Sequence, residues 1–105
     1  MTYEVIFDSG FLRQYESVVV WHEERSQGAY ISRLTGSLEQ LVSTLRTYPT
    51  RFPLLHLDGL DFPVRKATIL NYHVAYEINE AHARIRLLAI RHERSDPQRL
   101  VDDAK

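Results

Sequence analysis

The 105-residue chain contains no cysteine, and this absence excludes several kinds of site at once. Disulfide frameworks, thiolate zinc sites and cysteine nucleophiles all need the missing side chain. Long apolar runs are absent too, because the two longest, Val18–Trp21 and Leu87–Ile90, have four residues each. Neither run is long enough to span a membrane. The opening Met-Thr-Tyr-Glu-Val lacks the basic and apolar regions of a signal peptide, so we expect a cytoplasmic protein.

The chain also has little excess charge. Thirteen Lys and Arg residues stand against 14 Asp and Glu residues, which gives a formal net charge of -1. Because affinity for nucleic acid grows with the number of cationic contacts to phosphate, this balance argues against a surface that follows long nucleic-acid tracts. The 44% hydrophobic and 26% charged shares are those of a folded globular domain. We expect one domain over residues 1–105, with 98–105 as a flexible tail.

Metal and cofactor motifs are missing as well. The segment His22–Ser26 begins like a zinc-protease helix, but Ser26 stands where the second histidine is needed. The five histidines have no ligand spacing, and the four glycines are scattered and form no phosphate-binding loop. We therefore expect neither a metal nor an organic cofactor.

Hydrophobic spacing predicts one strand and two helices in the first half of the chain. Tyr3–Phe7 alternates and is rich in β-forming residues, which favours a strand. Apolar residues then recur at helical spacing over Phe11–Val19 and again over Ile31–Leu45. Gln27–Gly28 is a natural stop between them, so we expect two antiparallel helices with a short joint.

The second half begins with the proline-rich segment Tyr48–Pro63 and then predicts a β-meander. Its strands are expected over Val64–Ile69, Tyr72–Ile78 and Arg84–Arg91, with short turns between them. The order β-α-α-β-β-β predicts an α+β fold, in which a two-helix hairpin packs on one face of a four-stranded, mainly antiparallel sheet.

Strand alternation predicts which side chains share a face of this sheet. We place Ala81–His82 at the tip of the last hairpin. That choice pairs apolar residues with one another on the helix side: Ile78 with Ile85, Tyr76 with Leu87, and Val74 with Ala89. The same register sets Glu77 opposite Arg86. Arg65 also points toward the helices, where an acidic partner or loop carbonyls must satisfy its charge.

The outer face of the sheet, opposite the helices, is then expected to carry the side chains available for function. Its cationic or titratable members are Lys66, His73, Arg86 and His92. Its apolar members, a candidate contact for a partner helix, are Ala75, Leu88 and Ile90. Beyond the last strand, the segment Arg91–Pro97 adds Arg91 and Arg94. Such a run is often only a solvated strand end, but cations beside a histidine also suit phosphate binding and proton transfer.

Taken in order, these segments resemble the RelE/ParE superfamily of bacterial type II toxins. The resemblance covers nearly the whole chain: the first strand, the helical hairpin, the start of the proline-rich segment at Tyr48–Pro53, and Val64–Arg65 leading into Tyr72–Tyr76. The closing stretch Arg84–Pro97 is similar to the last strand of ParE-like toxins.

The resemblance implies a cytoplasmic growth-inhibiting toxin, of the kind known from plasmid stabilisation systems. A cognate antitoxin would neutralise it in a toxin–antitoxin hetero-oligomer. ParE-like members poison DNA gyrase by binding it, and this is the leading expectation. For binding contacts we expect four residues of the outer face and strand end: Arg86, Leu88, Ile90 and Arg94.

RelE-like members, the alternative, cut mRNA on the ribosome without a metal. For that activity the resemblance implies four catalytic residues: Lys66, His73, Arg91 and His92. The chain departs from the RelE pattern, since Val64 replaces a second lysine, His73 an arginine and Gln98 a terminal tyrosine. These departures favour the ParE-like function. A third alternative is an inactive relative whose fold serves only as a binding partner.

Overall fold

The computed structural model describes residues 2–55, 59 and 61–104. The elements follow the order β1 (Glu4–Phe7), α1 (Ser9–Glu23), α2 (Gly28–Thr47), β2 (Arg65–Ile69), β3 (Tyr72–Asn79), β4 (Arg84–His92) and α3 (Pro97–Ala104). The sheet order is β1-β4-β3-β2, with β1 parallel to β4 and the other pairs antiparallel. The expected α+β fold with a helical hairpin and a four-stranded, mainly antiparallel sheet is confirmed.

The two long helices begin and end where their sequence allows. Asp8 caps α1, because its carboxylate accepts a hydrogen bond from the backbone N–H of Gly10 at 3.0 Å. After α1, Ser26 adopts a left-handed conformation (φ 57°) that turns the chain into α2. The second helix runs without a break through Gly36.

The main core lies between this hairpin and the sheet. From α2, the leucines at helical spacing are buried: Leu34, Leu38, Leu41 and Leu45. They pack with Phe11 of α1 and with the sheet residues Ala67, Ile69, Tyr72, Val74, Tyr76, Ile85, Leu87 and Ile90. Burial of apolar surface on this scale is the main stabilising contribution to the fold.

The predicted register holds for half of the β3–β4 hairpin. Ile78 pairs with Ile85, and Glu77 lies opposite Arg86, with 2.6 Å between the carboxylate and the guanidinium. A β-bulge then inserts Leu88, so that Val74 pairs with Ile90 and not with Ala89. Past the bulge the strand's faces are exchanged. Ile90 therefore belongs to the main core, and its expected place on the outer face is wrong.

The expected flexible tail over 98–105 is also wrong for the described residues, because Pro97–Ala104 form α3. The Asp96 carboxylate accepts from the N–H of Gln98 at 2.9 Å, and proline suits the first helical position. Leu100, Val101 and Ala104 are buried, and α3 packs on the outer face of the sheet against a second apolar cluster formed by Val64, Ala75, Leu88 and Ala89.

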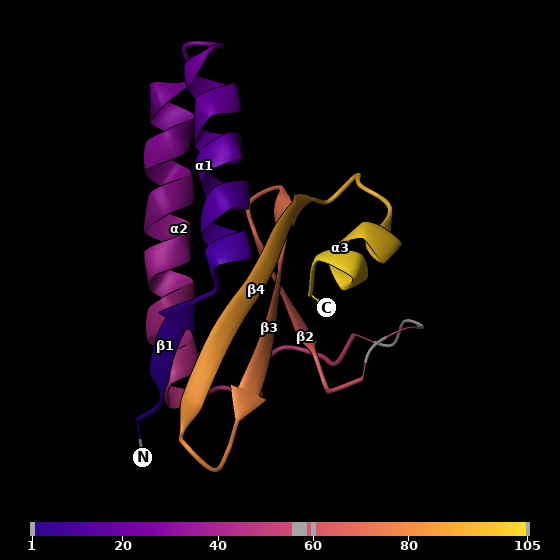
Figure 1. The fold of residues 1–105 in the computed structure, drawn as a ribbon. Coiled ribbons are helices and arrows are strands. Elements are labelled where there is room, and N and C mark those ends of the chain that lie inside the picture. Colours follow the sequence, from indigo (N-terminus) through magenta and orange to yellow (C-terminus); the bar gives the residue numbers. More distant parts are fainter. Residues whose placement is uncertain (1, 56–58, 60, 105) are drawn as a thin grey trace.

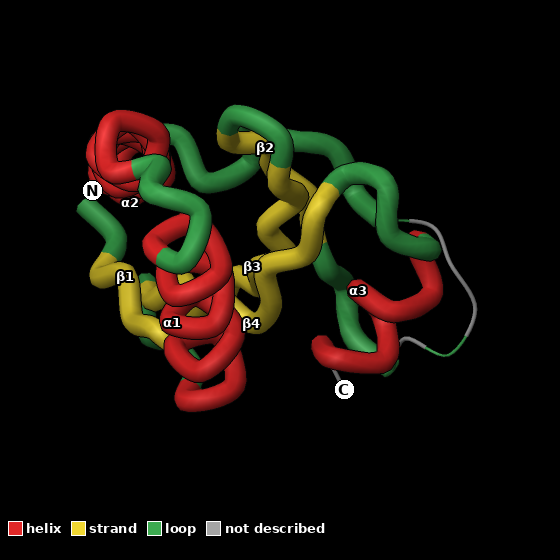
Figure 2. The backbone as a smooth tube through the Cα atoms, turned by 90° about the horizontal axis from the view of Figure 1, so that it is seen from above, coloured by secondary structure: helices red, strands yellow, loops and turns green. Residues whose placement is uncertain are grey.

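The molecule thus has three layers, with the α1–α2 hairpin and α3 on opposite sides of the sheet (Figures 1 and 2). The part of the outer face around Ala75, Leu88 and Ala89, which the sequence leaves open, is covered by α3. Leu88, expected as an exposed contact, is 3% exposed as a result.

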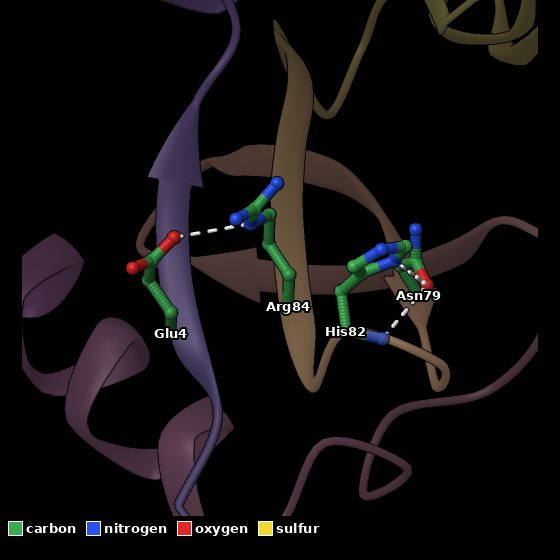
Figure 3. Close-up of polar contacts among 4 residues, drawn as sticks. All are labelled: Glu4, Asn79, His82 and Arg84. Atoms are coloured by element: carbon green, nitrogen blue, oxygen red, sulfur yellow. Dashed lines mark hydrogen bonds and ion pairs between the residues drawn. The ribbon is translucent and has the colours of Figure 1, made fainter.

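Polar contacts fasten both edges of the sheet, β1 on one side and β2 on the other. Arg84 donates to the carboxylate of Glu4 at 3.0 Å, which ties β1 to β4, and Asn79 and His82 bond to each other across the adjoining turn (Figure 3). At the other sheet edge, Arg65 donates to the backbone carbonyls of Thr50 and Phe52. The expectation that loop carbonyls satisfy Arg65 is confirmed.

Candidate functional site

The four residues expected to be catalytic come together at one place. Lys66, His73, Arg91 and His92 all line a small cavity between the outer face of the sheet and the start of α3. Strand pairing brings three of them together, because His73 lies opposite Arg91 on one side and opposite Thr68, two residues after Lys66, on the other. The cavity volume is about 40 Å³, enough for a water molecule but not for a nucleotide.

His73 is held in a form that can accept a proton. Its Nδ1 lies 3.0 Å from the hydroxyl oxygen of Thr68. Partial burial lowers the pKa of the imidazole, and neighbouring Lys66 and His92 lower it further, against an opposing effect of Glu93. The lowered pKa favours the neutral ring, which is the state required of a general base.

Arg91 is engaged by α3. Its Nε donates to one carboxylate oxygen of Asp103 at 2.5 Å, and its Nη2 donates to the other at 3.3 Å. This bidentate contact raises the pKa of Arg91, mainly through the hydrogen bond. The positive charge of Arg91, which we expected to be available for phosphate binding, is thus compensated by the carboxylate of Asp103.

His92 ends β4 beside Tyr72, its partner in the sheet. The two rings meet edge to face, with centroids 5.3 Å apart. Nδ1 of His92 accepts from the backbone N–H of Arg94 at 3.1 Å. The bulge puts His92 on the helix side of the sheet with Tyr72, so its expected place on the outer face is wrong. At the end of the strand it still lines the cavity beneath α3 as well as a cavity on the helix side.

Comparison with known proteins rests on structure alone, since neither a family model nor a curated protein matches the sequence. A chain of an archaeal RelE–RelB complex from Pyrococcus horikoshii has a TM-score of 0.60 and 19% sequence identity to this chain, and the match covers 91% of this chain and 100% of that one. The chain has the fold of the RelE toxins. A chain of the Mycobacterium tuberculosis toxin–antitoxin complex RelBE2 has a TM-score of 0.58 and 19% sequence identity, and the match covers 88% of this chain and 99% of that one. A mutant of Escherichia coli RelE in the free state has a TM-score of 0.63 and 14% sequence identity, and the match covers 99% of this chain and 95% of that one.

Within this RelE fold the four residues expected to bind a partner do not share one surface. Leu88 is buried under α3, whereas Ile90 is buried on the helix side. Arg86 lies between two carboxylates, Glu77 at 2.6 Å and Asp8 at 3.6 Å. Arg94 is exposed beyond the strand. A continuous binding patch of these residues is therefore absent from this conformation.

Sequence reasoning missed Asp103, the carboxylate that faces Arg91 in this RelE fold. The signal was present in the apolar spacing Leu100, Val101 and Ala104, which marks a short helix with one buried face. Among the described residues, no cluster of His, Asp or Glu side chains has the arrangement of a metal site. None of the described helices has the length and apolar character needed to cross a membrane.

Proposed function

We propose that this protein is the toxin of a type II toxin–antitoxin system. The observation that carries the proposal is the extent of the fold match, which covers between 88% and 99% of this chain in three RelE structures. Two of those structures are complexes, RelE with RelB and the toxin–antitoxin complex RelBE2. The proposed partner is a cognate antitoxin that neutralises the toxin in a hetero-oligomer, and the proposed compartment is the cytoplasm.

For the mode of action we propose that the toxin binds a protein target, as ParE-like toxins do, with DNA gyrase as the target. The cover that α3 places over the small cavity of the outer face supports this proposal. Ligand sites usually have a volume of roughly 300 Å³ or more, whereas the cavity beneath α3 has about 40 Å³. In addition, Asp103 already compensates the charge of Arg91.

A second candidate, metal-independent mRNA cleavage, is favoured by one specific observation. Lys66, His73, Arg91 and His92 line the same cavity. In such a reaction neutral His73 would accept the proton of an RNA 2′-hydroxyl that attacks the adjacent phosphorus. His92 would donate a proton to the 5′ oxygen as its bond to phosphorus breaks, and Lys66 would stabilise the phosphate charge. This candidate requires α3 to leave the outer face first.

Controlled expression in a bacterial host tests both candidates. The native chain is compared with a triple variant carrying Lys66→Ala, His73→Ala and His92→Ala, and colonies, cleaved gyrase–DNA complexes and ribosome-dependent mRNA cuts are scored. We expect killing and cleaved gyrase–DNA complexes with both chains. mRNA cuts that disappear in the triple variant would instead select the second candidate. Normal growth with the native chain would overturn the toxin function and favour an inactive relative.

A further inference from the structure

A second cavity lies on the helix side of the sheet. The second half of α1 and the turn into α2 extend past the start of β3 and the end of β4 (Figure 1). Residues of these segments line the cavity. Its volume is about 950 Å³, within the range of roughly 300 to 1,000 Å³ typical of sites for small organic ligands. Only Arg91, His92 and Ser95 also line the cavity beneath α3.

Aromatic rings form much of the wall of this helix-side cavity. Trp21 is 49% exposed. The ring of His22 stacks on Tyr30 with centroids 4.4 Å apart and meets Trp21 edge to face at 4.8 Å. Tyr72 and His92 form the edge-to-face pair described above, on the side of the sheet. Flat aromatic walls favour a flat, π-electron-rich ligand.

The central ring of this wall is fixed by hydrogen bonds. His22 is 6% exposed, and its Nδ1 lies 2.5 Å from Oε1 of Gln27 while its Nε2 lies 3.0 Å from the hydroxyl of Tyr72. Both ring nitrogens are therefore occupied, so His22 is a wall of the cavity and not a reacting group. A wall that is already ordered loses little entropy when a ligand binds.

The polar groups of the cavity are mainly donors. Oε1 of Gln14 accepts from the N–H of Ile90 at 2.8 Å, and Oε1 of Gln27 bonds to His22. The amide nitrogens of both glutamines make no hydrogen bond to the described residues. In the neutral form of His92 the hydrogen is carried by Nε2, because Nδ1 accepts from Arg94.

We propose that the helix-side cavity binds a nucleotide. The base lies against the aromatic rings, and its carbonyl oxygens and phosphate accept hydrogen bonds from the amide and imidazole donors. A base has a flat face that can stack on the aromatic rings, and a phosphate has oxygens that can accept hydrogen bonds from the donors without partners. The ligand is either a free nucleotide or one nucleotide of a single-stranded RNA. The proposal does not depend on the target of the toxin.

Trp21 makes the test direct, because it is the only tryptophan of the chain and lines the cavity. The purified full chain is titrated separately with GMP, UMP and a single-stranded oligoribonucleotide while tryptophan fluorescence is recorded. Ribose 5-phosphate and inorganic phosphate are the controls for binding through phosphate alone. We expect saturable quenching by a nucleotide or by the oligoribonucleotide and none by the two controls.

Two variants locate the site. Ser17→Phe places a ring at the cavity wall, whereas Ser43→Phe places the same ring on the exposed side of α2, away from the cavity. We expect the first to weaken binding by about tenfold or more, because the added ring takes the space of the base and about one base–aromatic stack is lost. The second should leave binding unchanged. Gln14→Glu keeps the oxygen that accepts from Ile90 but replaces the donor with negative charge, so it should also weaken binding.

The outcomes separate the possibilities. Quenching by GMP or UMP that is lost in both cavity variants supports the proposal with a free nucleotide as ligand. Quenching by the oligoribonucleotide alone, again lost in both, supports it with RNA as the source. Equal quenching by phosphate, binding that survives Gln14→Glu and Ser17→Phe, or no quenching by any nucleotide would overturn the proposal. Thermal unfolding of each variant shows that a loss of binding is not a loss of fold.

Discussion

Single side chains in this protein take their chemistry from the position that the strands give them. His73 would be an ordinary surface histidine in an isolated strand. In the sheet it lies near Lys66, bonds to Thr68 and is partly covered by the elements around the small cavity. Burial and the adjacent cation both oppose protonation, so the folded state prefers the neutral ring.

This preference makes the stability of the fold depend on pH. Because the pKa of His73 is lower in the folded chain than its ordinary value of about 6.5, the unfolded chain binds the proton more readily. Stability is therefore retained above that value and lost as pH falls below it. We expect His73→Gln, which cannot be protonated, to reduce the drop in melting temperature between pH 7.5 and pH 5.5. An unchanged drop would contradict the assignment.

Ser26 is one of three described non-glycine residues with a positive φ, together with Leu70 and Ala83. It holds a φ of 57° in the turn between α1 and α2, a conformation that places roughly 1 kcal/mol of strain on a residue with a Cβ. Ser26→Gly removes that strain but increases the freedom of the unfolded chain, so we expect a net stabilisation of roughly 0.5 kcal/mol. The matched change Ser43→Gly, inside α2, should be destabilising. Melting temperatures compare the two directly.

At the scale of elements, regular hydrophobic spacing was enough to predict six of the seven helices and strands. The bulge in β4 could not be predicted, because Leu87–Ile90 is apolar throughout and alternation gives no sign of an extra residue. The helix α3 was missed because it is short and half of its residues are charged or amide-bearing. These two features decide which side chains reach the outer face, so the cover of α3 over Lys66, His73 and Arg91 could not be predicted.

The packing of α3 gives a prediction for this element. Leu100 is 3% exposed against the outer face, whereas its neighbour Arg99 is exposed. Leu100→Ala removes buried methyl groups and should weaken the docking of α3, so amide hydrogens of residues 97–104 should exchange faster. Arg99→Ala, on the other side of the helix, should leave their exchange unchanged. Equal effects of the two substitutions would show that α3 is not held by its apolar face.

At the scale of the whole molecule, one sheet divides two unequal apolar layers. The apolar cluster on the helix side is the larger one and contains residues of α1, α2 and the strands. On the outer side, the short helix α3 is the only helix that packs on the sheet among the described residues (Figure 2). The smaller layer has fewer contacts to lose, so it should open before the larger one. Opening of α3 would expose Lys66, His73 and Arg91 while the rest of the fold stays intact.

Leu88 and Ile90 test this division, because they are two residues apart on β4 and the bulge sends them to opposite layers. Ile90→Ala leaves a void in the core that the helical hairpin shares, and we expect a loss of about 2 to 5 kcal/mol in the free energy of unfolding. Leu88→Ala weakens only the layer of α3, which can undock locally, so the global loss should be smaller. Urea unfolding measures the global loss, and hydrogen exchange locates it. Equal global losses would mean that the two layers unfold as one unit and that the outer face does not open on its own.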